Sequence, residues 1–547
     1  MISDLLLDVD VAVDLVSRRE PHGGLAEKVV GLATSENVRL WLYTGSVSRL
    51  ESEATQAFLD QLQASGDDFA PQEAAGQARR ALDDLSHQVQ WLAALAGEGP
   101  VFGSDDPHAR QLLSAVARLG DSARLLTRQE VLLGLDPDRT MHPKTFLAQG
   151  AGGSRPIPFI NLTAQQDRIR PRLEQNLHRV LHHGRYIMGD EVGELEGRLA
   201  DFVGVEQTVA CASGTDALLL ALMACGVGPG DAVFTSPFTF IATAEVIALL
   251  GATPVFVDID PSSLAIDPAQ LEKAVQAVQS NDPHQYPLPA VQGRGQLIPR
   301  AVMPVDLFGL PAEYDLINRT ATRYGLWVIE DAAQSLGAEY HGRKAGALGD
   351  IGCTSFFPAK PLGGYGDGGA AFTDNQELAA AMRSLAVHGT GQTRYDHDRI
   401  GLNARLDSLQ AAVLLPKLEI LPEEIGRRQR VAAAYSRLIT ERGLDLQVPS
   451  LPQGLSSAWA QYSVLARDEE HRRRWQQSLG RASVPTAVYY PKPLHMQRAF
   501  TGLGYRPEDM PISLAMSERI FSLPMHPYLA ETEILRIVKA MDQAEGA

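Results

Sequence analysis

Two short apolar runs, each followed by a chemically active side chain, constrain the fold of this chain more than any other feature. The run at 326–329 leads into Asp331, and the run at 351–357 leads into Lys360, which lies in a glycine-rich turn. Short apolar runs of this kind predict buried strands. Because ligands of open α/β sheets bind at the carboxyl ends of the strands, we expect both side chains at one edge of an α/β sheet.

The side chains at these two strand ends suit pyridoxal phosphate. A lysine amine forms a Schiff base with the cofactor aldehyde, a buried aspartate pairs with the pyridine nitrogen, and the hydroxyl of Ser355 meets the phosphate. Taken singly, Asp331 is better explained as an ordinary strand-end carboxylate and Lys360 as a surface lysine. The combination of the three side chains with the segments described next favours the cofactor site.

A segment upstream has the features of a phosphate site. A short strand at 208–211 runs into Ser213, and a helix opens at Gly214 and Thr215. The free N–H groups and the positive end of such a helix suit a phosphate. By itself this segment is better explained as a plain serine cap of the helix. Its position upstream of Asp331 and Lys360 makes the phosphate site the stronger hypothesis.

Composition sets the limits within which this chemistry must operate. With 547 residues the chain is too long for one hydrophobic core. The net charge of −17 argues against a general nucleic-acid-binding surface, although local arginines can still bind a small anion. Only three cysteines occur, without metal-like spacing, and the first residues carry no basic signal region. No apolar run is long enough to span a bilayer. These observations favour a cytoplasmic protein that does not bind membranes.

Residues 1–140 are expected to form a separate small α/β domain. Apolar runs at 5–13, 39–47 and 123–127 predict strands, and helical spacing at 74–95 predicts a helix between them. Acidic residues follow these elements, and clustered carboxylates can bind a divalent metal for phosphodiester cleavage. The candidates for such a metal site are Asp8, Glu51, Asp105 and Asp106.

This N-terminal segment resembles the PIN-type nuclease domain. The acids at 8, 51 and 105 or 106 match three of the acidic positions of that family, but Gln129 stands where the last acid is expected. The resemblance therefore implies a PIN-like fold with lost or reduced activity. The alternative is that these acids are solvated strand ends or helix caps.

A glycine- and proline-rich stretch then separates this segment from a longer enzyme-like region. We expect a linker at 141–157, a large cofactor-binding domain at 158–392 and a small α+β domain at 393–547. Within the last of these, helical spacing predicts two helices, at 406–415 and 427–438.

From residue 158 to its end, the chain resembles the DegT/StrS-type sugar-nucleotide aminotransferases of the aspartate-aminotransferase superfamily. The motifs that carry the resemblance are S-G-T-D-A-L at 213–218, F-T-F-I-A-T-A-E at 238–245, V-I-E-D-A-A-Q-S at 328–335, S-F-F-P-A-K-P-L-G at 355–363 and G-L-N-A-R-L-D-S-L-Q-A-A at 401–412. Within the family the chain is most similar to transaminases acting on UDP-2-acetamido-2-deoxy-3-oxo-glucuronate, because of 355–370, L-P-K-L-E-I at 415–420 and S-L-P-M-H-P-Y-L at 522–529.

The resemblance implies a fold-type I enzyme that forms a homodimer with shared active sites and uses pyridoxal 5'-phosphate. L-Glutamate and a UDP-keto-sugar would be its substrates, in nucleotide-sugar and surface polysaccharide biosynthesis. The cofactor would be held by Gly214, Thr215, Phe240, Asp331, Gln334, Ser355, Lys360 and, from the partner subunit, Asn403. Lys360 and Asp331 would be the catalytic pair. The UDP-sugar would contact Gly184, Tyr186, Arg405, Tyr489 and Tyr490.

Two departures from the family pattern leave the exact substrate open, and two other functions are alternatives. Ala359 precedes the lysine where relatives often carry serine, and Tyr489 replaces a common histidine. Arg405 suits a carboxylate, but a surface salt bridge explains it equally well. One alternative is a 4-keto nucleotide-sugar aminotransferase. The other is a metal-dependent nuclease module with a non-catalytic aminotransferase scaffold, which the intact lysine and aspartate argue against.

Overall fold

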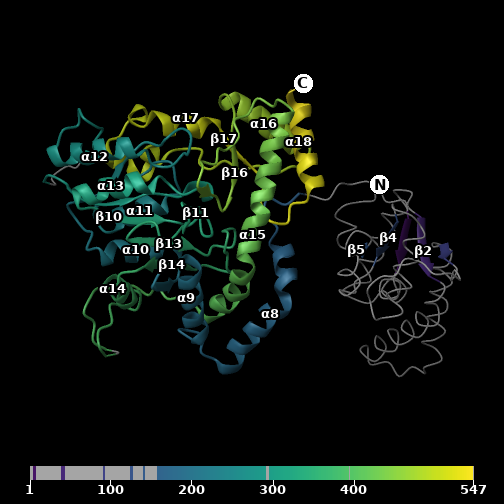
Figure 1. Ribbon diagram of the computed structural model, residues 1–547, viewed down its shortest axis with the longest axis horizontal. Coiled ribbons are helices and arrows are strands. Elements are labelled where there is room, and N and C mark those ends of the chain that lie inside the picture. Colours follow the sequence, from purple (N-terminus) through teal and green to yellow (C-terminus); the bar gives the residue numbers. More distant parts are fainter. Residues whose placement is uncertain are drawn as a thin grey trace, which may run out of the picture. The chain divides into compact units, whose positions relative to one another are not determined.

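The computed structural model describes residues 157–290, 295–393 and 395–545, together with five short strands that precede residue 157. The chain divides into two compact units, 1–156 and 157–547 (Figure 1).

The strands of the first unit form a parallel sheet. They are β1 (Asp4–Leu7), β2 (Arg39–Tyr43), β3 (Gln90–Leu92), β4 (Ala123–Leu126) and β5 (Thr140–Met141), in the order β3-β2-β1-β4-β5. The strands β1, β2 and β4 lie at the starts of the runs expected to be strands, at 5–13, 39–47 and 123–127. The prediction of a helix at 74–95 is wrong for residues 90–92, because Gln90–Leu92 forms the strand β3, which pairs with β2. Asp8, Glu51, Asp105, Asp106 and Gln129 lie outside the described residues, so the PIN-like fold stays a prediction.

A seven-stranded mixed sheet forms the centre of the second unit. Its strands, in spatial order, are β6 (Gln207–Cys211), β14 (Gly369–Thr373), β13 (Ile351–Ser355), β10 (Trp327–Asp331), β9 (Ile298–Met303), β7 (Asp231–Thr235) and β8 (Thr253–Phe256). Only β14 runs antiparallel to its neighbours β13 and β6; the other pairings of this sheet are parallel. Asp331 is the last residue of β10, and Ser355 is the last residue of β13 beside it.

Helices cover both faces of this sheet, which explains why its strands read as continuous apolar runs. On β7, Phe234 packs in one core with α12 (Pro268–Ser280) and α13 (Tyr314–Tyr324). Its neighbour Val233 packs in a second core with α10 (Gly214–Ala224), α11 (Ala242–Leu249) and α14 (Gln376–Ala386). Successive strand residues point to opposite faces, so the two cores lie on opposite sides of one sheet.

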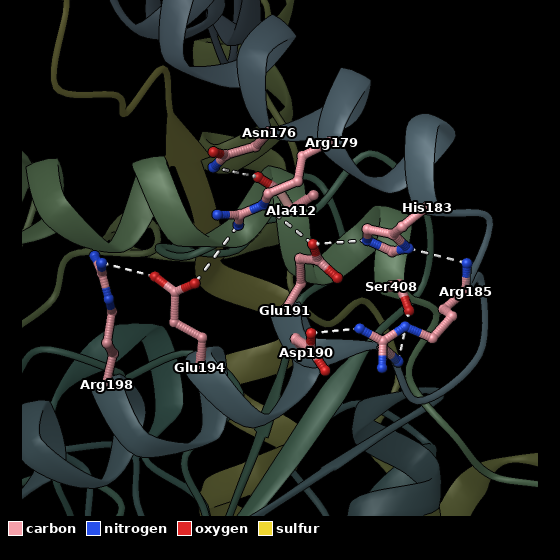
Figure 2. Close-up of polar contacts among 11 residues, drawn as sticks. Asn176, Arg179, His183, Arg185, Asp190, Glu191, Glu194, Arg198, Ser408 and Ala412 are labelled. Atoms are coloured by element: carbon pink, nitrogen blue, oxygen red, sulfur yellow. Dashed lines mark hydrogen bonds and ion pairs between the residues drawn. The ribbon is translucent and has the colours of Figure 1, made fainter.

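A long helix, α15 (Ser408–Glu441), packs against α8 (Leu162–His183), α9 (Asp190–Val203) and α18 (Glu531–Glu545) (Figure 1). The prediction of two separate helices here is wrong: Pro416 and Pro422 lie inside one continuous helix. Proline lacks the N–H that would bond the carbonyl four residues earlier. For Pro416 that carbonyl belongs to Ala412, and it accepts a hydrogen bond from Asn176 Nδ2 of α8 at 3.2 Å instead (Figure 2).

The remaining elements include the C-terminal α+β region. They are β11 (Glu339–Tyr340), β12 (Arg343–Lys344), β15 (Leu455–Ser456), β16 (Tyr462–Leu465), α16 (Glu469–Arg481), α17 (Pro511–Arg519) and β17 (Ile520–Leu523), with short 3₁₀ helices η2 (Leu307–Gly309), η3 (Leu494–Met496), η4 (Arg498–Leu503) and η5 (Pro507–Asp509). None of the helices in the described ranges is long and apolar enough to cross a membrane.

Candidate active site

Asp331 is held at the carboxyl end of β10 with both carboxylate oxygens bonded. Its side chain is 5% exposed. Thr243 Oγ1 donates to Oδ2 at 2.8 Å, and the N–H of Ala333 donates to Oδ1 at 3.2 Å. Burial raises the pKa of Asp331, while these two hydrogen bonds and the positive charge of Lys360 oppose that rise. Specific hydrogen bonds therefore stabilise the Asp331 carboxylate, which is too buried to be stabilised by solvent.

Lys360 lies in the loop that connects β13 to β14. Its N–H donates to the carbonyl of Phe357 at 2.9 Å. The loop is closed by two backbone hydrogen bonds of Phe356, which accepts from Gly364 and donates to the carbonyl of Gly368, each at 2.7 Å. Burial lowers the pKa of Lys360, and the charge of Asp331 partly opposes this effect. A lysine with a lowered pKa has a larger fraction of neutral amine, which is the form that acts as nucleophile and base.

The start of α10 lies against the end of β13. A Cβ atom at Gly214 would come within 2.6 Å of the Ser355 Cβ, so no larger residue fits there. Ser213 caps the helix by accepting the N–H of Asp216 at 3.0 Å. The N–H groups of Gly214 and Thr215 find no acceptor in the described part of the chain. Two free N–H groups beside a serine hydroxyl form an anion site at a helix N-terminus.

Gln334 and two aromatic side chains form a wall beside the aspartate. Gln334 is buried; its Oε1 accepts the N–H of Phe308 at 2.8 Å, and its Nε2 donates to the Tyr490 hydroxyl at 3.4 Å. The Tyr490 ring lies 6.5 Å from the ring of Phe240, centroid to centroid. Burial raises the pKa of Tyr490, which keeps its hydroxyl neutral. Tyr489 contacts Tyr490, with the two ring centroids 5.8 Å apart.

The other predicted residues, called the rim below, lie on two neighbouring segments, 184–186 and 403–405. The backbone from Asn403 to Arg405 runs beside the end of β6, where Ala212 N–H donates to the Ala404 carbonyl at 3.2 Å. Gly184 ends α8 with a positive φ of 70°. Tyr186 follows it, and its carbonyl accepts the N–H of Ser408.

A buried carboxylate orders the turn that carries Gly184 and Tyr186 (Figure 2). Glu191 accepts from His183 Nε2 and from Arg179 Nε, each at 3.1 Å. The N–H of Arg185 donates to His183 Nδ1 at 3.0 Å, so Nε2 carries the proton that bonds Glu191. The hydrogen bonds from His183 and the charge of Arg179 lower the pKa of Glu191 against the effect of burial. Hydrogen bonds between residues of the same chain therefore hold this turn.

The sequence did not identify Thr243 or Phe308 as part of this site. Thr243 lies three residues after Phe240, about one helical turn, within the F-T-F-I-A-T-A-E segment. That spacing was the available signal. Phe308 contributes a backbone N–H, which no side-chain pattern reveals.

Comparison with known proteins gives a consistent result. The model of the DegT/DnrJ/EryC1/StrS aminotransferase family matches residues 167–542. UDP-2-acetamido-2-deoxy-3-oxo-D-glucuronate aminotransferase from Pseudomonas aeruginosa is 48% identical over 386 residues, which cover 70% of this chain and 99% of that protein. UDP-N-acetyl-3-dehydro-alpha-D-glucosamine 3-aminotransferase from Acidithiobacillus ferrooxidans is 39% identical over 385 residues, 70% of this chain and 96% of that protein.

Solved structures have the same fold. A DegT DnrJ EryC1 StrS aminotransferase from Brucella abortus is 47% identical with a TM-score of 0.66, covering 72% of this chain and all of that chain. NtdA from Bacillus subtilis, solved with bound pyridoxamine phosphate, is 26% identical with a TM-score of 0.63, covering 72% of this chain and 85% of that chain. The predicted fold-type I architecture is confirmed.

The site fits the cofactor that this comparison implies. Pyridoxal 5'-phosphate needs an amine for its aldehyde, a carboxylate for its ring nitrogen and donors for its phosphate. Lys360, Asp331 and the free N–H groups of Gly214 and Thr215 supply these three kinds of group. Pyridoxal 5'-phosphate is the cofactor of this enzyme.

Proposed function

The chain belongs to the DegT/DnrJ/EryC1/StrS aminotransferase family, and we propose that it transfers an amino group to the 3-keto group of a UDP-sugar of the 2-acetamido-2-deoxy-3-oxo-glucuronate type. The observation that carries this proposal is the 48% identity with the Pseudomonas aeruginosa enzyme along nearly its whole length. The name of the Acidithiobacillus ferrooxidans relative also places the amino group at carbon 3 of a UDP-sugar. The product is a 3-amino sugar for polysaccharide biosynthesis.

Lys360 and Asp331 perform the chemistry in this proposal. Bound pyridoxal phosphate supplies an electron sink and an aldehyde that carries the amino group. Lys360 binds the aldehyde when no substrate is present, and its free amine then moves the proton at the substrate carbon. Asp331, ionised, holds the proton on the ring nitrogen. The hydrogen bonds from Thr243 and Ala333 support this role, because they stabilise the carboxylate against the cost of its burial.

The phosphate and the ring have their own contacts. The N–H groups of Gly214 and Thr215 and the hydroxyl of Ser355 would hold the phosphate, and Phe240 and Gln334 would contact the ring. Gln334 suits this task because its hydrogen bonds to Phe308 and Tyr490 already fix its amide.

A second copy of the chain completes the site, with Asn403 of each subunit reaching the phosphate of the other. Exposed apolar side chains support such a dimer, because a soluble monomer rarely leaves a large apolar patch in water. Phe240 is 55% exposed, and Tyr186, which is 47% exposed, is followed by two further exposed apolar residues, Ile187 and Met188.

L-Glutamate is the amino donor, and the rim binds the sugar nucleotide in the cytoplasm. Gly184, Tyr186, Tyr489, Tyr490 and Arg405 contact the UDP-sugar. Arg405 suits the uronate or the donor carboxylate, because its planar guanidinium forms paired hydrogen bonds with a carboxylate. Its guanidinium makes no ion pair with any residue of the described ranges. The three cysteines, buried and free, are consistent with a reducing compartment.

A panel of keto sugars that differ in one feature at a time tests the proposal. Purified protein with L-glutamate is incubated with the UDP-3-keto-glucuronate, the matching 3-keto-glucosamine compound and a UDP-4-keto sugar. Formation of 2-oxoglutarate and the mass of the aminated sugar are measured. We expect the highest kcat/KM for the 3-keto uronate. A preference for the 4-keto sugar would contradict the proposal, and activity only with another donor would contradict the role of glutamate.

A further inference from the structure

A buried lysine of α15 reaches into the loop that carries Lys360. This segment, residues 356–368, is called the lysine loop below. The Lys417 side chain is 1% exposed. Its Nζ donates to the carbonyl of Gly363 at 2.7 Å and lies 4.2 Å from the centroid of the Tyr365 ring. Both partners belong to the lysine loop, three and five residues after Lys360.

A second side chain of α15 holds the same loop. Gln410 Oε1 accepts the N–H of Tyr365 at 2.9 Å. Cβ atoms added at Gly364 and Gly366 would come within 2.9 and 2.8 Å of the Gln410 amide. The loop therefore has glycine where the helix presses against it. Gln410 and Lys417 are seven residues apart, two helical turns, so they project from one face of α15.

Stability alone does not explain a buried ammonium at this position. Burying a charge is costly, and replacing a buried ionic group by an apolar one of similar volume is often neutral or stabilising. Burial lowers the pKa of Lys417 to about 8, and the charge of the buried Glu424 opposes this effect, so Lys417 stays mainly charged at neutral pH. A charged donor forms a shorter and stronger hydrogen bond than a neutral one, and its attraction to the Tyr365 ring fixes a second point of the loop.

We infer that Lys417 is a positioning residue of the active site, which fixes the lysine loop so that the Lys360 amine stays aligned with the cofactor. This inference rests on the proposed role of Lys360. The groups that fix the lysine loop are the ammonium of Lys417, the ring of Tyr365 and the amide of Gln410. A purely structural lysine, by contrast, would only join α15 to the large domain, and its loss would change folding stability but not the cofactor's geometry.

The experiment compares holoenzyme variants by how they hold the cofactor. Lys417→Met removes the ammonium, Lys417→Arg keeps a charged donor, and Lys273→Met on the surface of α12 is the control for loss of a lysine. Visible circular dichroism reports the cofactor's orientation, and the rate of cofactor release to a carbonyl reagent reports how firmly it is held. The melting temperature of the apoprotein reports folding stability alone.

We expect Lys417→Met to release the cofactor about tenfold faster or more, which is the effect of one hydrogen bond to a charged group. Its visible circular dichroism should weaken while the apoprotein melts no lower than the wild type. Lys417→Arg should restore part of both signals, and Lys273→Met should match the wild type. Wild-type dichroism and release in Lys417→Met would overturn the inference.

Tyr365 provides an independent pair of variants for the case in which Lys417→Met does not fold. Tyr365→Phe keeps the ring that faces the ammonium, and Tyr365→Leu removes it. Release should be about three- to tenfold faster in Tyr365→Leu and unchanged in Tyr365→Phe. Equal release from both variants would also overturn the inference.

Borohydride reduction followed by peptide mapping separates this inference from the proposed function. A label on a lysine other than Lys360 in the wild type would reject the site assignment itself. A label on Lys360 with unaltered Lys417→Met and Tyr365→Leu variants would reject only the inference.

Discussion

The two sides of the active site are built in different ways. On the strand-end side, Asp331 is fixed by the chain itself: its N–H donates to the Pro304 carbonyl at 2.9 Å, its carbonyl accepts from Asp306, and its carboxylate accepts from Thr243. On the rim, Tyr186 and Asn403 are exposed. The side chains of the strand-end side are hydrogen-bonded within one chain, whereas those of the rim are exposed and available to a ligand or to a second copy of the chain.

The difference follows from what each side must bind. A buried carboxylate works only if fixed dipoles replace the lost water, so its partners must be in place before the cofactor arrives. A surface that admits and releases a nucleotide sugar needs open access, and the exposed apolar groups there can be covered by a partner. Mutations on the strand-end side should therefore act within one subunit, and mutations on the rim should act across subunits.

Lys360→Ala should give the largest effect and act entirely on the strand-end side. The variant loses the amine that binds the aldehyde and moves the proton, so kcat should fall by at least about 10²–10⁴-fold. The visible absorption band of the lysine-bound cofactor should disappear as well. Both are measured on purified protein with added pyridoxal phosphate, using Lys273→Met as the control. A variant that keeps both the band and the turnover would show that another group does this chemistry.

Sequence patterns predicted the positions of Asp331 and Ser355 well, because both residues end short apolar strands. The neighbouring acids Glu330 and Asp331 show the limit of that reading. Glu330 points to the other face of the strand, where it accepts the N–H of Leu348 at 2.8 Å. A run of apolar residues on both faces does not reveal which of two adjacent acids faces the site, and only the strand-end position and the family resemblance favour Asp331.

Long-range contacts were beyond the reach of the sequence. The partner of Asp331, Thr243, lies 88 residues earlier in the chain. The two helices expected at 406–415 and 427–438 are one helix that runs through Pro416 and Pro422, and Asn176 of α8 bonds the carbonyl that Pro416 frees. A side chain that bonds the freed carbonyl helps a helix to continue through a proline. Which side chain does so depends on tertiary packing, which local patterns do not contain.

A mixing experiment tests whether the rim acts across subunits. Asn403→Asp places a carboxylate against the phosphate and should inactivate the enzyme, as Lys360→Ala does. Co-expression of these two variants should restore activity, because in each mixed dimer one site combines an intact Lys360 with the intact Asn403 of the other chain. Random pairing gives about a quarter of the wild-type activity. No recovery in isolated mixed dimers would mean that Asn403 serves its own subunit, and a fully active Asn403→Asp variant would mean that it serves no site.

Thr243→Val should give the smallest effect and sharpen the account of the strand-end side. The hydroxyl of Thr243 lowers the pKa of Asp331 by stabilising the carboxylate, so its removal lets burial raise that pKa further. If ionised Asp331 is the active form, the acidic limb of the kcat/KM profile should move to higher pH, and kcat at neutral pH should fall about tenfold at most. Thr235→Val is the matched control, since its buried hydroxyl donates to the Met303 carbonyl at 2.8 Å and not to the aspartate. A shift of the acidic limb in both variants would mean that it reports general loosening of the sheet, and an unshifted limb in Thr243→Val would mean that the ionisation of Asp331 does not limit turnover.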